Sequence, residues 1–120
     1  MSKRWISISL GVLVGAAPGL SAQERASLPP AELAKAAGCL ECHSVANKDV
    51  GPAWADVAAR YKGDPKARER LIEIVKKGGK GNWPMRITRG VPMPPHSPRL
   101  SDEEISRLVD WIVGIEPGKQ

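Results

Sequence analysis

The sequence predicts an all-α domain of about four short helices and one long proline-rich loop. Apolar residues recur at intervals of three and four after Asp64 and after Ser101, which is typical of amphipathic helices. No segment shows the apolar–polar alternation of a half-buried strand, and there is no internal repeat. A chain of 120 residues is long enough for one such domain.

The first 22 residues have the pattern of a secretory signal peptide. Lys3 and Arg4 precede a mostly apolar run over residues 5–17, and small residues follow, with cleavage expected after Ala22. The run is short for a membrane span, which needs about 20 residues; an uncleaved anchor is the alternative. We expect a signal peptide at 1–22, one domain at 23–120, a periplasmic location, and no stable membrane insertion of the mature chain.

The charge balance excludes one class of partner. The formal net charge is +5, and two of the 18 Lys and Arg residues belong to the leader. No long basic run or basic stripe interleaved with aromatic residues remains, so nucleic-acid binding is not expected. The modest positive charge favours acidic protein partners.

Helix signals follow one another along the domain. Residues 23–28 are expected to be a loose N-terminus, and a helix over 31–38 follows two prolines and ends at a glycine. A second short helix is expected over 53–61, between Gly-Pro and Gly. The apolar face of the first helix consists of Leu33, Ala34 and Ala37; the core aromatics are expected to be Trp54 and Trp111.

The two longer helices have clearer ends. Asp64-Pro65 is expected to cap the third helix, which carries the stripe Leu71, Ile74 and Val75 and ends at Gly78-Gly79. Lys76 and Lys77 in its last turn are expected to be a solvated helix end; a docking rim with Lys80 is the alternative. The last helix starts with a capping box formed by Ser101 and Glu104, and it ends near Gly114.

A long loop rich in Gly and Pro lies over residues 78–100. Loops of this length inside a compact domain are usually functional or disordered. Within it, VPMPPH places Met93 between one proline and two more. Proline fixes φ and pushes the preceding residue away from the helical region. Met93 is therefore expected on a stiff, extended segment, as for a side chain that is needed at one place.

The two cysteines form the motif Cys39-x-x-Cys42-His43, which is the attachment signature of a c-type haem. Both thiols would form thioethers to the macrocycle, and the adjacent imidazole would bind the iron. Three other interpretations compete: a thioredoxin-like dithiol, a zinc site that also uses His96, and a short structural disulfide. Helical flanks argue against a thioredoxin-like dithiol, which needs a preceding strand. The second histidine does not have the spacing of a zinc site. A disulfide across two residues would constrain little of the unfolded chain.

A haem iron has a second axial position, and the stiff loop suggests its ligand. Met93 can present a thioether there, and His/Met ligation favours electron transfer over small-molecule chemistry. The rivals are Met85, expected to pack against its own loop, and His96, expected to be an exposed loop residue.

Taken together, these segments resemble the small class I bacterial cytochromes c, the periplasmic monohaem electron carriers. The resemblance covers essentially the whole region after the leader, through AAGCLECHS, GPAWADVAARYKG, the GGKGNW loop, VPMPP and DEEISRLVDWIVG. It implies a class I cytochrome c fold around one covalently bound haem c. By motif, the resemblance implies that Cys39 and Cys42 form the thioethers and that His43 and Met93 are the axial ligands. It also implies that the carbonyl of Pro52 accepts from the imidazole N–H, and that the indole of Trp83 donates to a haem propionate.

One segment departs from that pattern. Seven residues, PMRITRG, separate Trp83 from VPM, whereas the tryptophan lies closer in compact members of the family. Core packing is thus the alternative for Trp83, and Arg86 and Arg89 are expected to be surface arginines rather than partners of the propionates.

The function expected from these observations is one-electron transfer without catalysis, between redox protein partners. The alternatives are a cytochrome subunit fixed to a periplasmic dehydrogenase or reductase, and a haem sensor with an open sixth site.

Overall fold

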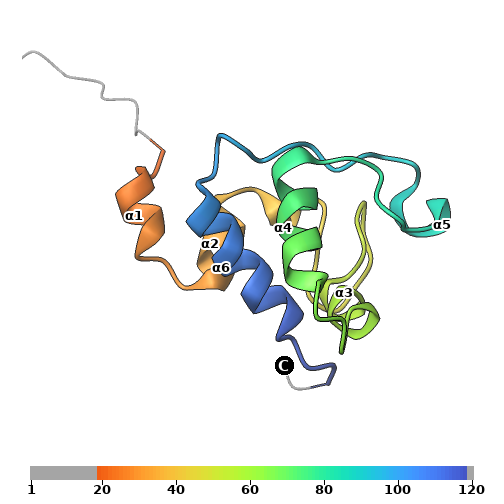
Figure 1. Cartoon of the computed structure of the whole chain (residues 1–120). Coiled ribbons are helices and arrows are strands. Elements are labelled where there is room, and N and C mark those ends of the chain that lie inside the picture. The colour runs from red at the N-terminus through yellow and green to blue at the C-terminus, as the bar shows by residue number, and fades with distance from the viewer. Residues whose placement is uncertain (1–18, 119–120) are drawn as a thin grey trace, which may run out of the picture.

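The computed structural model describes residues 19–118 (Figure 1). Most of the predicted signal peptide lies outside the described residues. Those residues contain six α-helices, one 3-10 turn and no strand, so the predicted all-α class is confirmed. The elements are α1 (Ala22–Ala26), α2 (Pro30–Ala36), η1 (Cys39–Glu41), α3 (Trp54–Arg60), α4 (Ala67–Lys77), α5 (Met85–Thr88) and α6 (Asp102–Val113). No helix in this part of the chain is both long and apolar enough to cross a bilayer.

The capping box predicted for the last helix is present at the start of α6. The Ser101 hydroxyl accepts from the backbone N–H of Glu104 at 3.1 Å, and the Glu104 carboxylate accepts from the backbone N–H of Ser101 at 2.8 Å. Two backbone N–H groups that have no partner within the helix are thereby satisfied. Gly114 closes the helix, as predicted.

The start of α4 differs slightly from the expectation. The helix begins at Ala67, and no side chain caps it. Asp64 instead accepts from the backbone N–H of Lys66 at 2.9 Å and pairs with Arg70 at 3.2 Å. Asp64 therefore stabilises the turn that leads into α4 rather than the helix terminus itself.

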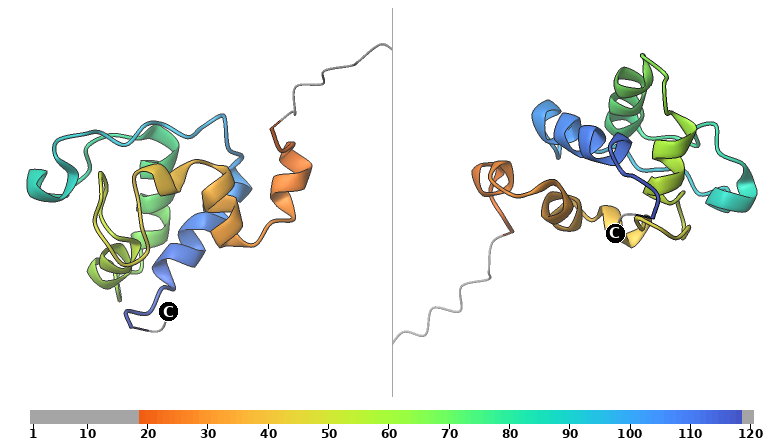
Figure 2. Two further views of the ribbon diagram at one scale, coloured as in Figure 1. Left: turned by 180° about the vertical axis from the view of Figure 1, so that it is seen from behind. Right: turned by 90° about the horizontal axis from the view of Figure 1, so that it is seen from below.

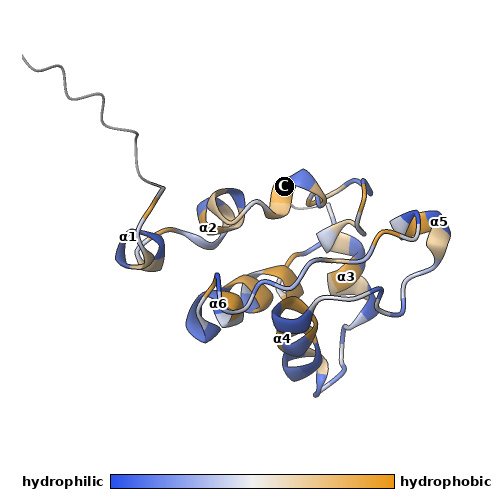
Figure 3. Cartoon of the chain, turned by 90° about the horizontal axis from the view of Figure 1, so that it is seen from above, coloured by the Kyte–Doolittle hydropathy of each residue, from blue (hydrophilic) through white to orange (hydrophobic). Residues whose placement is uncertain are grey.

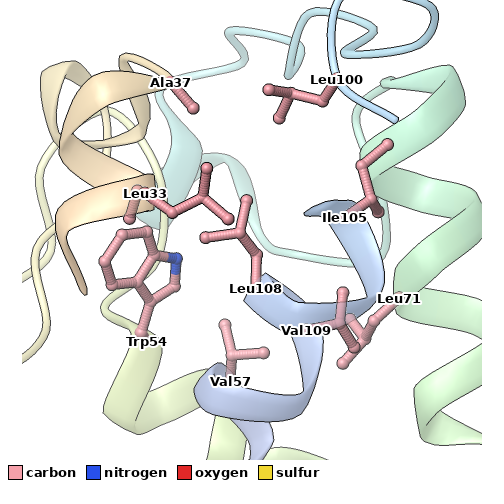
Figure 4. Close-up of a cluster of buried hydrophobic side chains, with 10 residues drawn as sticks. Leu33, Ala37, Trp54, Val57, Leu71, Leu100, Ile105, Leu108 and Val109 are labelled. Atoms are coloured by element: carbon pink, nitrogen blue, oxygen red, sulfur yellow. The ribbon is translucent and has the colours of Figure 1, made fainter. Parts of the chain in front are cut away.

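The core forms where α6 packs against α2, α3 and α4 (Figure 4). Leu33 of α2 and Ile105 and Val109 of α6 are completely buried, as helical periodicity predicted. Alanines on the inner face of α2 permit this close packing because they carry almost no side-chain bulk. Trp54 is buried at the start of α3, and its ring meets that of Trp111 in an edge-to-face arrangement with centroids 5.3 Å apart.

The prediction of a loose N-terminus was wrong. Residues 22–26 form α1, which has its own capping box between Ser21 and Glu24. Arg25 pairs with Glu104 at 2.7 Å, and Arg107 donates to the carbonyl of Ala26 at 2.9 Å. These long-range contacts to α6 hold a segment that has no buried residue of its own.

A second helix was not predicted: α5 lies inside the long loop, at the opposite end of the molecule from α1 (Figures 1 and 2). It is a single turn, in which the backbone N–H of Thr88 donates to the carbonyl of Pro84 at 3.2 Å. The expected packing role of Met85 was wrong, because this side chain is 74% exposed. Arg86 and Arg89 are exposed, as predicted.

Candidate functional site

A cavity of about 580 Å³ lies beside the core, between η1, α3, α4, α6 and the loop before α6. Its walls are mostly apolar. They also contain every site residue predicted from the sequence: Cys39, Cys42, His43, Pro52, Trp83 and Met93. The fold therefore brings together residues from four separate segments. Met85, Arg86 and Arg89 do not line the cavity.

Cys39 begins the 3-10 turn η1 and Cys42 caps its end. Gly38, with φ of 80°, precedes the turn and redirects the chain after α2. The backbone N–H groups of Cys42 and His43 both donate to the carbonyl of Cys39, at 3.2 and 2.9 Å. All three motif residues are thus fixed within one turn. Both thiols are free, and burial raises the pKa of the Cys39 thiol, while the nearby charge of Arg99 opposes that rise.

The imidazole of His43 is held by its environment on two sides. Its Nδ1 lies 2.8 Å from the carbonyl oxygen of Pro52, and its ring stacks on Trp54 with centroids 5.5 Å apart. Since a carbonyl can only accept, Nδ1 carries the proton in this contact and Nε2 keeps its lone pair. Burial lowers the pKa of His43, and the bond to Pro52 opposes that shift. The neutral tautomer that can ligate through Nε2 is therefore favoured.

Gly51 makes room for this imidazole, a role that the sequence did not reveal. A Cβ at this position would lie 2.4 Å from Cε1 of His43 and 2.8 Å from its Nδ1. The backbone N–H of Gly51 also donates to the carbonyl of Cys42 at 2.7 Å, which folds the loop back onto the motif. The only signal was its place in the Gly-Pro pair, which we interpreted as the start of a helix.

The loop that carries Met93 is pinned to the end of α4. Met93 and Gly79 exchange two backbone hydrogen bonds, each of 2.9 Å. Gly78, with φ of 69°, lies directly below: a Cβ there would be 2.3 Å from the carbonyl oxygen of Met93 and 2.7 Å from the nitrogen of Pro95. The glycine pair therefore ends α4 and also allows the backbone of the Met93 segment to lie in direct contact with the end of that helix.

His96 was predicted to be an exposed loop residue, and this was wrong. It is 5% exposed, and its backbone N–H donates to the carbonyl of Val75 at 3.1 Å. Arg99 donates to Nδ1 of His96 at 2.6 Å and to the carbonyl of Ala37 at 3.0 Å. Burial lowers the pKa of His96, and the charge of Arg99 lowers it further. Arg99 thus connects the methionine loop to the end of α2, a link that no local pattern indicates.

Trp83 lies at the cavity wall and is half-buried. The guanidinium of Arg60 lies over its ring, 4.5 Å from the centroid, and donates to the carbonyl of Asn82 at 3.0 Å. Such a cation–π contact holds the indole in place. Lys76 pairs with Asp102 at 3.1 Å and Lys77 with Glu73 at 2.8 Å, and neither lysine lines the cavity, whereas Lys80 does.

The residues fit a covalently bound haem. Two free thiols on one turn, an imidazole with its Nδ1 already engaged, and a thioether on a fixed loop all border an apolar cavity, whose size suits a large planar ligand. Within the described residues, no three His, Cys, Asp or Glu side chains gather to hold a bare metal ion, which argues against the zinc alternative. An all-α fold with this site defines a monohaem protein of the c type.

Comparisons with known proteins agree. The profile of the Cytochrome c family matches residues 30–116. Cytochrome c-551 of Allochromatium vinosum is 47% identical over 83 residues, which are 69% of this chain and 82% of that protein. Cytochrome c-552 of Hydrogenobacter thermophilus is 44% identical over 85 residues, covering 71% and 80%.

Solved structures give the same result. The crystal structure of Nitrosomonas europaea cytochrome c552 superposes with a TM-score of 0.63 at 38% identity, covering 72% of this chain and 99% of that one. The class 1 cytochrome MtoD of Sideroxydans lithotrophicus superposes with a TM-score of 0.58 at 29% identity, covering 71% and 90%. This chain belongs to the cytochrome c family, of the small class I bacterial kind. It carries one covalent c-type haem and serves in electron transport.

Proposed function

We propose that the chain is an exported one-electron carrier whose haem iron is ligated by His43 and Met93. The observation that carries the proposal is that both residues border the cavity that also contains the two motif thiols. The bound haem supplies reversible one-electron chemistry between Fe(III) and Fe(II). The protein's part is to hold the ligands in place, so that little rearrangement accompanies the change of charge.

Each residue has a defined part in this proposal. Cys39 and Cys42 form the thioethers. His43 ligates through Nε2, and the Pro52 carbonyl at 2.8 Å fixes its tautomer and ring orientation, as partners of ligating histidines generally do. Met93 supplies the sixth ligand from a segment pinned by Gly79, which lowers the ordering cost of holding a weak ligand.

Trp83 is proposed to contact a haem carboxylate through its indole N–H. Its place at the cavity wall supports this role despite the longer loop that follows it. The stack with Arg60 fixes the ring and brings a positive charge near it, which suits an anionic partner.

A closed coordination sphere is what separates a carrier from an enzyme or a sensor. With His43 and Met93 both bound, the iron has no open position for a substrate or gas. The chain would then exchange electrons with redox protein partners and catalyse no reaction of its own.

The export part of the proposal rests on the leader. Residues 1–22 would be removed after Ala22, leaving the haem domain at 23–120 in the periplasm. The mass of the protein recovered from the periplasm tests this directly, with a mature N-terminus at Gln23 as the expected result.

The ligation is tested by the absorption spectrum of the oxidised holoprotein. We expect a weak long-wavelength band from sulfur-to-iron charge transfer, and we expect Met93→Ala to abolish it while haem stays attached. Met85→Ala is the matched control, because Met85 is exposed and does not line the cavity. Attached haem without the band, combined with rapid carbon monoxide binding by the reduced protein, would refute His/Met ligation and support a sensor.

A further inference from the structure

We propose that α5 and the loop beside it form a docking surface for an acidic protein partner. The surface consists of Lys48, Met85, Arg86, Arg89 and Val91, which we call the α5 surface. The proposal rests on the proposed function, since it concerns where an electron carrier meets its partner.

The position of the α5 surface suits this role. Helix α5 extends away from the helical core and lies beyond α3 in all three views (Figures 1 and 2). The same segment reaches the haem cavity, because Thr88 and Val91 line it. A protein seated on α5 would therefore lie next to the cavity wall rather than on a remote face.

The charge of the α5 surface is not neutralised. Residues 78–100 contain four basic residues and no acidic one. Within the described part of the chain, Lys48, Arg86 and Arg89 take part in no ion pair, whereas Arg68, Lys76 and Lys77 each have a carboxylate partner. Asp49 is the one carboxylate adjacent to them in sequence. The surface thus has a positive field that attracts acidic partners and raises their association rate.

The centre of the surface is apolar and exposed. Met85 is 74% exposed and Val91 is 49% exposed, which makes them two of the few large apolar side chains that the fold leaves in contact with solvent. Hydrophilic and hydrophobic stretches lie side by side in α5 (Figure 3). Arginine and methionine are both enriched in protein interfaces, and methionine adapts its shape to different partners.

The surface is also preformed. The backbone N–H groups of Gly90 and Val91 donate to the side chain and carbonyl of Thr88, at 3.3 and 3.0 Å, and Lys48 donates to the carbonyl of Arg86 at 3.5 Å. Thr88 itself is buried. Little conformational freedom would be lost on docking, which favours association.

Arg89 gives an independent indication. Its φ is 54°, and it is the one described non-glycine residue with a positive φ. Glycine adopts this conformation without steric strain, whereas an arginine does not. Non-glycine residues held in this conformation cluster at functional sites, which supports a functional role for Arg89 at the end of α5.

The test uses a gold electrode coated with a carboxylate-terminated alkanethiol as a defined acidic surface. Holoprotein adsorption and the electron-transfer rate are measured at low ionic strength for the wild type and for Arg86→Glu/Arg89→Glu. The control, Lys35→Glu/Lys66→Glu, makes the same change of net charge at exposed lysines away from the cavity. A hydroxyl-terminated monolayer serves as the uncharged surface.

We expect the Arg86/Arg89 variant to lose about tenfold or more in adsorption rate, as for electrostatically steered association, and the control to stay close to the wild type. Arg86→Gln/Arg89→Gln should give a smaller loss in the same direction, which covers the case of a misfolded double Glu variant. Equal losses in both Glu variants, no loss in either, or equal adsorption to the hydroxyl surface would overturn the proposal.

The failure of this proposal is distinguishable from failure of the carrier function. All variants should keep the long-wavelength band and a reversible one-electron wave with a small diffusing mediator. Loss of those signals in the wild type would refute the proposed function, whatever happens at the electrode surface.

Discussion

At the scale of single residues, the glycine at position 51 determines where the imidazole of His43 can lie. Three atoms of that ring approach within 3 Å of the place where a Cβ would be. The surrounding structure cannot yield easily, because the ring is also stacked on Trp54 and bonded to Pro52. The role of Gly51 is thus steric and is tied to the proposed ligand.

Gly51→Ala should therefore displace His43 and lower the yield of protein with attached haem, since overpacking of such a site costs about 1–3 kcal/mol. The haem content per polypeptide, from the pyridine haemochrome spectrum, measures the effect. Gly114→Ala is the matched control, because a Cβ there would meet its nearest neighbour at 3.4 Å. Equal haem content in the two variants would show that the ring does not need this space.

A second residue-scale prediction concerns Glu104, which is buried and serves two partners at once. Burial by itself raises the pKa of Glu104, but the hydrogen bonds from Arg25 and Ser101 outweigh burial, so that the pKa lies below its usual value of 4.5. A lowered pKa in the folded state stabilises the protein above pH 4.5, and this contribution is lost as the pH falls through the folded-state pKa.

Glu104→Gln should accordingly lower the free energy of unfolding at pH 7 by about 1–3 kcal/mol, because it removes a charged partner from buried groups. The difference in free energy of unfolding between the variant and the wild type should decrease as the pH drops below 4.5. Urea denaturation at several pH values measures both effects. Glu103→Gln, at an exposed neighbouring position, is the control. A gap independent of pH would contradict the role of ionised Glu104.

At the scale of elements, the end of α4 acts as a support for the methionine loop. Gly78 and Gly79 let two backbone segments approach so closely that any side chain at position 78 would collide with the Met93 carbonyl. The same two residues thus end α4 and position the segment that carries the proposed ligand Met93.

Gly78→Ala is expected to lift the loop and to weaken or remove the sulfur-to-iron band, while Cys39 and Cys42 keep the haem attached. The positive φ of 69° adds backbone strain to the collision. The absorption spectrum and the carbon monoxide binding rate of the reduced protein measure the outcome. Gly63→Ala provides the comparison, since it has a similar φ of 79° and open space around it. A normal band in Gly78→Ala would mean that the loop can shift without losing its ligand.

Elements with strong local signals were predictable, and elements held by distant contacts were not. Periodicity located α4 and α6, and a capping box marked the start of α6. The haem motif, the proline-rich loop and the family resemblance together identified the residues that border the cavity. Helix α5 was missed because one turn has no periodicity to detect. The buried state of His96 was missed because it depends on Arg99 and on the backbone of α4. For α1, Ser21 was assigned to the leader and Glu24 to a loose N-terminus, so the capping box that they form was not recognised.

At the scale of the whole molecule, the helices enclose a cavity beside the hydrophobic core. A cavity of about 580 Å³ borders several core residues, among them Leu71, Leu108 and Val109. Small domains usually need an additional stabilising element such as a metal or a covalent link. A haem attached at Cys39 and Cys42 would occupy the cavity and tie η1 to the rest of the fold.

Cys39→Ala/Cys42→Ala should thus yield a haem-free chain with reduced helical circular dichroism and no cooperative thermal transition. An empty apolar cavity removes both burial and packing contacts from its walls. Leu40→Ala is the control, since this residue lies between the cysteines, is 44% exposed and leaves both thiols intact. A haem-free variant that melts cooperatively with native helicity would contradict this dependence.

The position of α1 bears on whether the leader is cleaved before or after this segment folds. The expected cleavage bond, between Ala22 and Gln23, lies in the first turn of α1, and Ser21, which caps that helix, is on the departing side. A peptidase needs an extended segment, so processing has to precede the folding of α1. The mature protein would then start inside a helix that has lost its cap and gained a positive terminus at its positive pole. Removal of the leader would therefore loosen the start of α1 and leave its attachment to α6 to the Arg25–Glu104 pair and to the bond that Arg107 donates to the Ala26 carbonyl.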